Sequence, residues 1–119
     1  MPKLINLPTF KSSSGQLSVL EKKIPFKIKR CYFIYNVSNQ RGGHRHKKTK
    51  QAMVCVNGSC KVFVKNKKNT KFFLLNKPNK CLMLDPKDWH KMYNFEKSTV
   101  LLIIASHKYN KNDYIYNAY

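Results

Sequence analysis

Acidic side chains are scarce in this chain. Only five of its 119 residues are Asp or Glu, whereas 24 are Lys or Arg, and the formal net charge is +19. No carboxylate lies within residues 41–46, a segment that holds two of the four histidines. Histidine is therefore the better candidate for a group that exchanges protons near neutral pH.

Arginine is scarce as well, since Arg30, Arg41 and Arg45 are the only arginines among the basic residues. The lysines are scattered along the chain among Asn, Tyr and Ile, and a run such as residues 65–69 is typical of a solvated turn. This pattern does not predict a nucleic-acid partner, although the positive potential would attract an anionic substrate such as a sugar nucleotide.

Long apolar runs are also absent. The longest, residues 100–105, is far shorter than the roughly 20 residues that a membrane helix needs. The N-terminal residues show no apolar stretch with a cleavage-like site, so we expect no signal peptide, no membrane association and a cytoplasmic location. In that reducing compartment the four cysteines are expected to be free, small core residues.

Short segments rich in β-branched and aromatic residues recur about every ten residues, and turn residues separate them. This pattern predicts a single all-β domain over residues 1–119, a sandwich or barrel, with a helical turn expected only within residues 112–118. A jelly roll is the member of this class that encloses a ligand cavity. The expected strands are residues 16–20, 24–29, 31–37, 51–56, 60–64, 71–75, 81–84 and 99–105.

Turn chemistry predicts how some of these strands connect. Asn57-Gly58 indicates a two-residue hairpin with positive φ at both positions. Residues 65–70 are expected to form a longer hairpin loop, and residues 76–79 a turn. The polar stretch 12–15 is expected to separate the first residues from the body of the domain.

The segment Arg41–His46, with the sequence RGGHRH, carries the clearest chemical signal. Residues i and i+2 of a strand point to the same face, so His44 and His46 are expected to reach into one cavity. Two neutral imidazoles in one cavity suit either proton transfer or metal ligation.

The spacing around these histidines resembles that of the cupin jelly roll. After His44 and His46, four residues lead to Gln51 and six more to Gly58, as in the first cupin motif; Pro86 and then residues 90–94, HKMYN, resemble the second. The carboxylate expected at position 51 is an amide. The three histidines 44, 46 and 90 would still suit Zn or Fe, but the loss of an anionic ligand argues against a metal.

A closer resemblance covers nearly the whole chain. It is carried by residues 30–37, 41–48, 55–62, 75–80, 89–93, 105–106 and 113–115, which look like the corresponding blocks of the dTDP-4-keto-6-deoxyglucose 3,4-ketoisomerases, in the same order. The resemblance implies a cupin that uses neither metal nor other cofactor and forms a homodimer by exchanging N-terminal strands, here within residues 1–11. It also implies that the product supplies a 3-aminotransferase that makes a 3-amino-3,6-dideoxyhexose for a bacterial surface glycan such as the lipopolysaccharide O-antigen.

The same resemblance makes His44 and His46 the catalytic pair, and we assign removal of the C3 proton to His44, which follows two glycines. Arg41 is expected to bind the pyrophosphate or the enolate oxygen. Tyr32 is the preferred catalytic hydroxyl, and Gln51 is expected to bind a sugar hydroxyl or orient an imidazole.

Three further residues are predicted to bind substrate: Tyr35, Trp89 and His90. Tyr32 and Tyr35 lie on opposite faces of one predicted strand, so only one of them is expected to line the cavity. Trp89 has two interpretations, a core position or a ring that stacks on thymine.

Other functions remain open at this stage. A 3- or 3,5-epimerase begins with the same deprotonation at C3, whereas a metal-dependent cupin oxygenase would need a bound metal. A sugar sensor or a basic nucleic-acid binder would show no turnover. The sequence leaves open the stereochemistry at C4 of the product.

Overall fold

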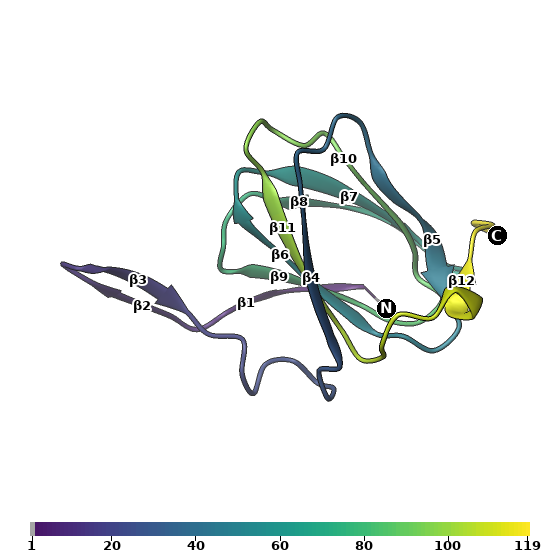
Figure 1. Ribbon diagram of the computed structural model, residues 1–119, viewed down its shortest axis with the longest axis horizontal. Helices are drawn as coiled ribbons and strands as arrows, with labels where there is room; N and C mark the ends of the chain where they lie inside the picture. The colour runs from purple at the N-terminus through teal and green to yellow at the C-terminus, as the bar shows by residue number, and fades with distance from the viewer. Residues whose placement is uncertain (1) are drawn as a thin grey trace.

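The computed structural model describes residues 2–119, which form two five-stranded antiparallel sheets that face each other and a separate two-stranded sheet (Figure 1). The first sheet contains β1 (Lys3–Asn6), β4 (Arg30–Tyr35), β6 (Gln51–Asn57), β9 (Lys80–Leu84) and β11 (Val100–Ala105); the second contains β5 (Arg41–His46), β7 (Cys60–Lys65), β8 (Thr70–Leu75), β10 (Trp89–Tyr93) and β12 (Tyr114–Ile115). The order of strands is β1-β9-β6-β11-β4 in the first sheet and β12-β5-β10-β7-β8 in the second. This arrangement is the predicted jelly-roll sandwich.

The main core lies between the two sheets. Along β7 and β10 buried residues alternate with more exposed ones, because successive side chains of a strand point to opposite faces. The buried side chains are almost all apolar, so their removal from water stabilises the packing of one sheet on the other. They are Met53, Cys55, Cys60, Val62, Val64, Leu75, Leu82, Leu84, Met92, Leu101 and Ile103.

A second, smaller cluster covers the outer face of the first sheet, where Ala52, Val54 and Ile104 are buried. Ile24 and Phe26 pack against this cluster, but they do so from turns and irregular backbone. The strand predicted at 24–29 is therefore wrong. Pro25 has no backbone N–H to donate, so this segment covers the sheet with side chains instead of joining it.

The connection at Asn57-Gly58 also differs from the prediction. β6 pairs with β9 and β11, whereas β7 pairs with β8 and β10, so these residues form a corner between the two sheets and not a hairpin. Only Gly58 has a positive φ, and a Cβ there would collide with Thr99. Asn57 instead donates its side-chain N–H to Ser98 O at 2.7 Å. The predicted hairpin over 65–70 is confirmed by the pairing of β7 with β8, and residues 76–79 form the expected turn.

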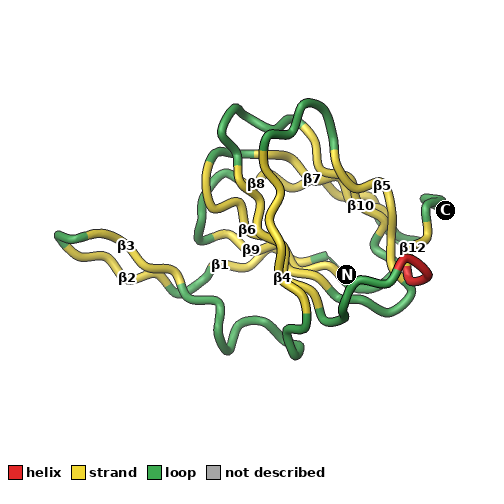
Figure 2. Tube along the Cα trace, in the orientation of Figure 1, coloured by secondary structure: helices red, strands yellow, loops and turns green. Residues whose placement is uncertain are grey.

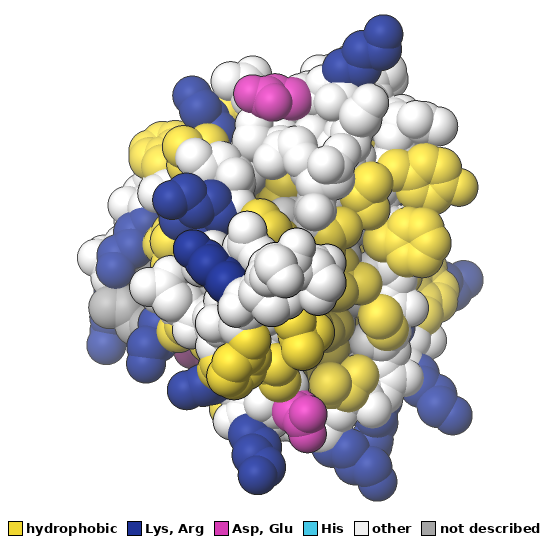
Figure 3. Space-filling view, turned by 90° about the vertical axis from the view of Figure 1, so that its left-hand side faces the viewer, with side chains coloured by type: hydrophobic (Ala, Val, Ile, Leu, Met, Phe, Trp, Pro, Cys, Tyr) yellow, Lys and Arg dark blue, Asp and Glu magenta, His cyan; other side chains and the backbone are white. Residues whose placement is uncertain are grey.

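The N-terminal hairpin, β2 (Thr9–Ser12) with β3 (Gly15–Ser18), projects from the body of the molecule (Figures 1 and 2). Residues 12–15, expected as a break, form its tip. β1 pairs with β9 of the same chain, and the exchange of N-terminal strands between two chains stays a prediction. Figure 3 views the molecule from this side and shows hydrophobic side chains gathered among lysines.

Near the C-terminus a 3-10 turn, η1 (Lys111–Asp113), precedes β12. The sequence predicted a helical turn within residues 112–118, a range that starts one residue after the start of η1. Within residues 2–119 no helix is long and apolar enough to cross a bilayer. All four cysteines are free, and all but Cys31 are buried.

Candidate active site

A bulge in β5 positions the first histidine. β5 pairs with β10 so that His44 faces His90 and Gly42 faces Lys91, which leaves Gly43 as the extra residue. Gly42 and Gly43 both have positive φ, at 88° and 84°, and this conformation favours glycine. A Cβ on Gly42 would lie 2.9 Å from the carbonyl oxygen of His90. The two glycines therefore let β5 approach β10 closely and direct His44 toward His90.

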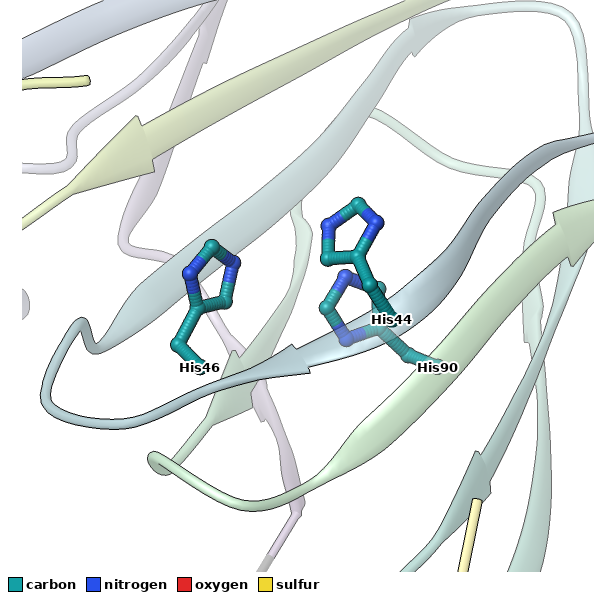
Figure 4. Close-up of side chains that lie close together, drawn as sticks. All are labelled: His44, His46 and His90. Atoms are coloured by element: carbon teal, nitrogen blue, oxygen red, sulfur yellow. The ribbon is translucent and has the colours of Figure 1, made fainter. Parts of the chain in front are cut away.

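Three imidazoles converge between the sheets at this point (Figure 4). The ring of His44 lies 5.1 Å from that of His46 and 4.9 Å from that of His90, measured between centroids. One nitrogen of each ring lies within 4.8 Å of the others. His44 and His46 thus share a face of β5, as their spacing predicts, and His90 joins them from β10.

His46 is held by an acid that is distant in the sequence. Its Nδ1 lies 3.1 Å from Oδ2 of Asp113, and both side chains are at least 95% buried. Thr49 donates its hydroxyl to the same carboxylate, and the backbone N–H of Lys48 donates to the other oxygen at 3.0 Å. The carboxylate therefore fixes the orientation of the His46 ring and can stabilise a positive charge on it.

Hydrogen bonds also orient other polar groups of the cluster. His90 Nδ1 lies 3.0 Å from the carbonyl oxygen of Asp88, so it carries the hydrogen and leaves Nε2 with a lone pair. Gln51 donates its amide N–H to the Tyr32 hydroxyl at 3.4 Å. Among the described residues, His46 Nε2 and Gln51 Oε1 are buried without a hydrogen-bond partner.

A cavity of about 400 Å³ opens beside the cluster. His44 and His90 line it, whereas His46 is buried and is not part of its lining. Arg30 and Arg41 make the cavity positive, and several hydroxyl groups of tyrosines surround it. The lining is completed by Tyr32, Ile34, Gln40, Gly42, Met92, Tyr109, Tyr114 and Tyr116.

Burial keeps the imidazoles neutral. Burial, with the neighbouring His90, His46 and Arg30, lowers the pKa of His44 to about 3. Burial also lowers the pKa of His90 to about 4. It lowers the pKa of His46 too, although Asp113 opposes that shift. At neutral pH all three rings hold lone pairs that can accept a proton or bind a metal ion.

The other titratable groups are shifted by the same surroundings. Burial raises the pKa of Tyr32, so its hydroxyl keeps its proton. Burial alone would raise the pKa of Asp113, but hydrogen bonds from Thr49, Lys48 and His46 outweigh it and lower the value. Asp113 is thus an anion beside His46 at neutral pH.

Most of the predicted site residues lie together here, namely His44, His46, His90, Tyr32, Arg41 and Gln51. Two do not. Tyr35 lies on the outer face of β4, 58% exposed, against Phe33. Trp89 lies on the face of β10 opposite His90, with its ring near Phe63 and its N–H donated to Tyr116 O.

Sequence reasoning missed Asp113 and Tyr114, which contact the histidine cluster, and Arg30, which contacts Tyr114 and Tyr32 beside it. The Tyr114 ring lies 4.6 Å from that of His44 and 4.5 Å from that of His46. Arg30 donates to the Tyr114 hydroxyl at 3.1 Å, and its guanidinium lies 4.3 Å from the centre of the Tyr32 ring. The scarcity of acids was the available signal for Asp113. A buried acid is almost always paired, and this chain has few acids that could pair with a buried histidine.

Comparisons with known proteins identify the family of this chain. The family described as "FdtA: WxcM-like, C-terminal" matches residues 1–119. The TDP-4-oxo-6-deoxy-alpha-D-glucose-3,4-oxoisomerase of Aneurinibacillus thermoaerophilus is 38% identical over 117 residues, which cover 95% of this chain and 84% of that protein.

Two solved structures share the fold closely. A 3,4-ketoisomerase from Helicobacter canadensis has a TM-score of 0.93 and 38% identity, covering 98% of this chain and 90% of its own. A mutant of the 3,4-ketoisomerase QdtA from Thermoanaerobacterium thermosaccharolyticum, in complex with TDP-4-keto-6-deoxyglucose, has a TM-score of 0.92 and 38% identity, covering 98% of this chain and 87% of its own. With its whole length matched by the family and its histidine cluster set in the same cupin fold, this chain belongs to the TDP-sugar 3,4-ketoisomerases and is an isomerase.

Proposed function

We propose that the protein moves the keto group of dTDP-4-keto-6-deoxy-D-glucose from C4 to C3 by proton transfer through an enediolate. The observation that carries this proposal is His44, a neutral imidazole on the cavity wall with the His46–Asp113 pair beside it. The named substrate is the sugar that the related QdtA structure contains.

The first step is removal of the C3 proton. The C4 ketone acidifies this proton, and His44 is the histidine of the β5 pair that lines the cavity, so it is the group that reaches carbon. Its lone pair takes the proton, C3 and C4 become doubly bonded, and negative charge develops on O4. His44 then carries a positive charge, which the nearby Asp113 anion offsets through His46.

The second step completes the movement of the keto group from C4 to C3. A proton is returned to C4, the hydroxyl proton of O3 is lost and O4 gains a proton, so that the ketone stands at C3 and all atoms balance. His46, held by Asp113, and the protonated Tyr32 are the groups that move protons around the oxygens. Arg41 and Arg30 supply positive charge for O4 in the enediolate and for the pyrophosphate of the substrate.

This mechanism needs no metal and no other cofactor, because imidazoles and hydroxyls supply every proton transfer. The product, a 3-keto sugar nucleotide, suits a 3-aminotransferase in the synthesis of a bacterial surface glycan. The cytoplasmic location and this pathway stay predictions.

The decisive experiment supplies dTDP-4-keto-6-deoxyglucose and follows the sugar by NMR. We expect a 3-keto product, which a 3-aminotransferase traps as a 3-amino sugar whose C4 configuration is then read. An epimerase would return the proton to the same carbon and leave the ketone at C4. Absence of turnover with this sugar would contradict the proposal and favour a sensor.

Chelation separates this mechanism from that of a metal-dependent cupin. After dialysis against EDTA we expect turnover to be undiminished. Turnover that is lost on dialysis and restored by Zn or Fe would instead make the metal a cofactor.

A further inference from the structure

We propose that His44, His46 and His90 form a Zn²⁺ site and that zinc bound there inhibits the isomerase. The claim that zinc inhibits rests on the proposed function, whereas the claim that zinc binds does not. One nitrogen from each of the three rings lies within 4.8 Å of the others, and the rings come from two adjacent strands of one sheet. Imidazole nitrogen is a preferred zinc ligand, and three of them with a water complete a tetrahedral site.

The hydrogen bonds behind the cluster favour metal binding. His46 Nδ1 is hydrogen-bonded to Asp113, and His90 Nδ1 to the Asp88 carbonyl oxygen. Zinc-binding histidines commonly donate one ring N–H to a carboxylate or backbone carbonyl, which fixes the ring and leaves the other nitrogen to bind the metal. His46 Nε2 is that other nitrogen, and it is buried without a partner.

Zinc binding requires a small movement of the imidazole rings. Tetrahedral Zn–N bonds of about 2.0–2.1 Å place ligand nitrogens roughly 3.4 Å apart. The ring nitrogens, which lie within 4.8 Å of one another, must therefore approach by up to about 1.4 Å. His44 is half-buried and lines the cavity, so its side chain has room to make most of this change. Arg30 and Arg41 on the same cavity oppose a cation, and no carboxylate is among the three ligands, so the binding is reversible.

Zinc inhibits because it takes the lone pairs that catalysis uses. An imidazole bound to Zn²⁺ cannot accept the C3 proton, and the metal with its water occupies the space next to the sugar ring. At free zinc tenfold above the dissociation constant, mass action leaves roughly one chain in ten free of metal, so turnover falls roughly tenfold.

Calorimetry on the untagged, EDTA-treated protein tests the site, with Zn²⁺ as the titrant. We expect one zinc per chain, and a Co²⁺ complex whose visible spectrum shows a four-coordinate site with nitrogen ligands. His44→Asn and His90→Asn should each abolish this binding, with circular dichroism confirming that the variants are folded. His107→Asn is the matched control, because His107 lies outside the cluster and contacts Ser106.

The possible results distinguish failure of the zinc site from failure of the proposed function. No zinc uptake by a protein that turns over substrate would overturn the zinc site and leave the proposed function standing. Binding that persists unchanged in both His44→Asn and His90→Asn would also overturn it, because the metal would then lie elsewhere. Zinc binding through the histidines in a protein without isomerase turnover would support the site and contradict the proposed function. Turnover that rises with zinc, or is unaffected by saturating zinc, would overturn the claim that zinc inhibits.

Discussion

The two histidines of β5 differ in their surroundings although they are two residues apart. His44 faces the cavity, whereas His46 is 97% buried and bound to Asp113. A group that removes a proton from carbon must first reach that carbon, so position assigns this step to His44. His46, which has an anionic partner, is better suited to hold or pass on positive charge.

Exchange of the C3 proton with solvent tests this division of roles. We expect His44→Asn to stop both C3 exchange in D₂O and product formation, and His46→Asn to retain exchange while turnover falls by roughly 10²–10⁴. NMR of the substrate measures both quantities. Exchange that persists in His44→Asn but vanishes in His46→Asn would reverse the roles, and exchange in both variants would point to Tyr32.

Asp113 is expected to act through His46. In Asp113→Asn the shape is kept but the anion is lost, so we expect kcat to fall by roughly tenfold, less than on loss of an imidazole. The free energy of unfolding should fall by about 1–3 kcal/mol, because the Thr49 and Lys48 donors lose a charged acceptor. Kinetics and denaturant unfolding measure the two effects.

Glu96→Gln is the matched control for this substitution, because it also converts an acid to an amide but at an exposed position. It should leave kcat and stability unchanged. An Asp113→Asn variant with full activity would show that the carboxylate is only structural.

At the scale of the elements, the bulge in β5 is the feature on which the site depends. Gly42→Ala places a Cβ 2.9 Å from the His90 carbonyl oxygen at a φ of 88°. We expect a loss of stability of about 1–3 kcal/mol from strain at this backbone conformation, together with lower turnover because His44 and His90 move apart. Thermal unfolding and kinetics check this.

Gly15→Ala provides the comparison. Gly15 also has a positive φ, at 141°, but no atom lies within 4 Å of a Cβ built there. It is at the tip of the β2–β3 hairpin, so we expect an intact histidine cluster and unchanged turnover per folded chain. Equal losses of activity in the two variants would contradict a special role for the bulge.

At the scale of the whole molecule, the projecting hairpin predicts a homodimer. Phe10 and Leu17 are paired across the hairpin and are each 62% exposed. A groove of about 570 Å³ between the hairpin and the first sheet includes Val54, Val56 and Leu102 (Figure 3 shows this side). Burying each exposed apolar side chain in a partner contributes roughly 1.5–3 kcal/mol.

Light scattering after gel filtration should therefore give twice the mass of one chain, and Phe10→Ser with Leu17→Ser should shift the mass toward that of a monomer. Because each chain carries a formal net charge of +19, added salt should favour the dimer. Phe72→Ser is the control, since Phe72 is 67% exposed on β8, in the other sheet. A wild-type monomer at micromolar concentration would contradict the prediction.

Local pattern alone determined a large part of this protein. The period of two along strands predicted that His44 and His46 share a face, and that Tyr32 and Tyr35 do not. The same rule separates Trp89 from His90, since adjacent residues of a strand point to opposite faces, and applying it would have removed Trp89 from the cavity. The spacing of short strands predicted the all-β sandwich.

Tertiary structure alone decided the rest, because it depends on contacts between residues that are distant in the chain. Asp113 reaches His46 across 67 positions, and Arg30 reaches Tyr114 across 84. Asn57-Gly58 carries the residues of a hairpin but becomes a corner, since β6 and β7 find their partners in different sheets. Turn and strand preferences act over a few residues, whereas the pairing of sheets and the burial of an acid beside a histidine are set by how the whole chain packs.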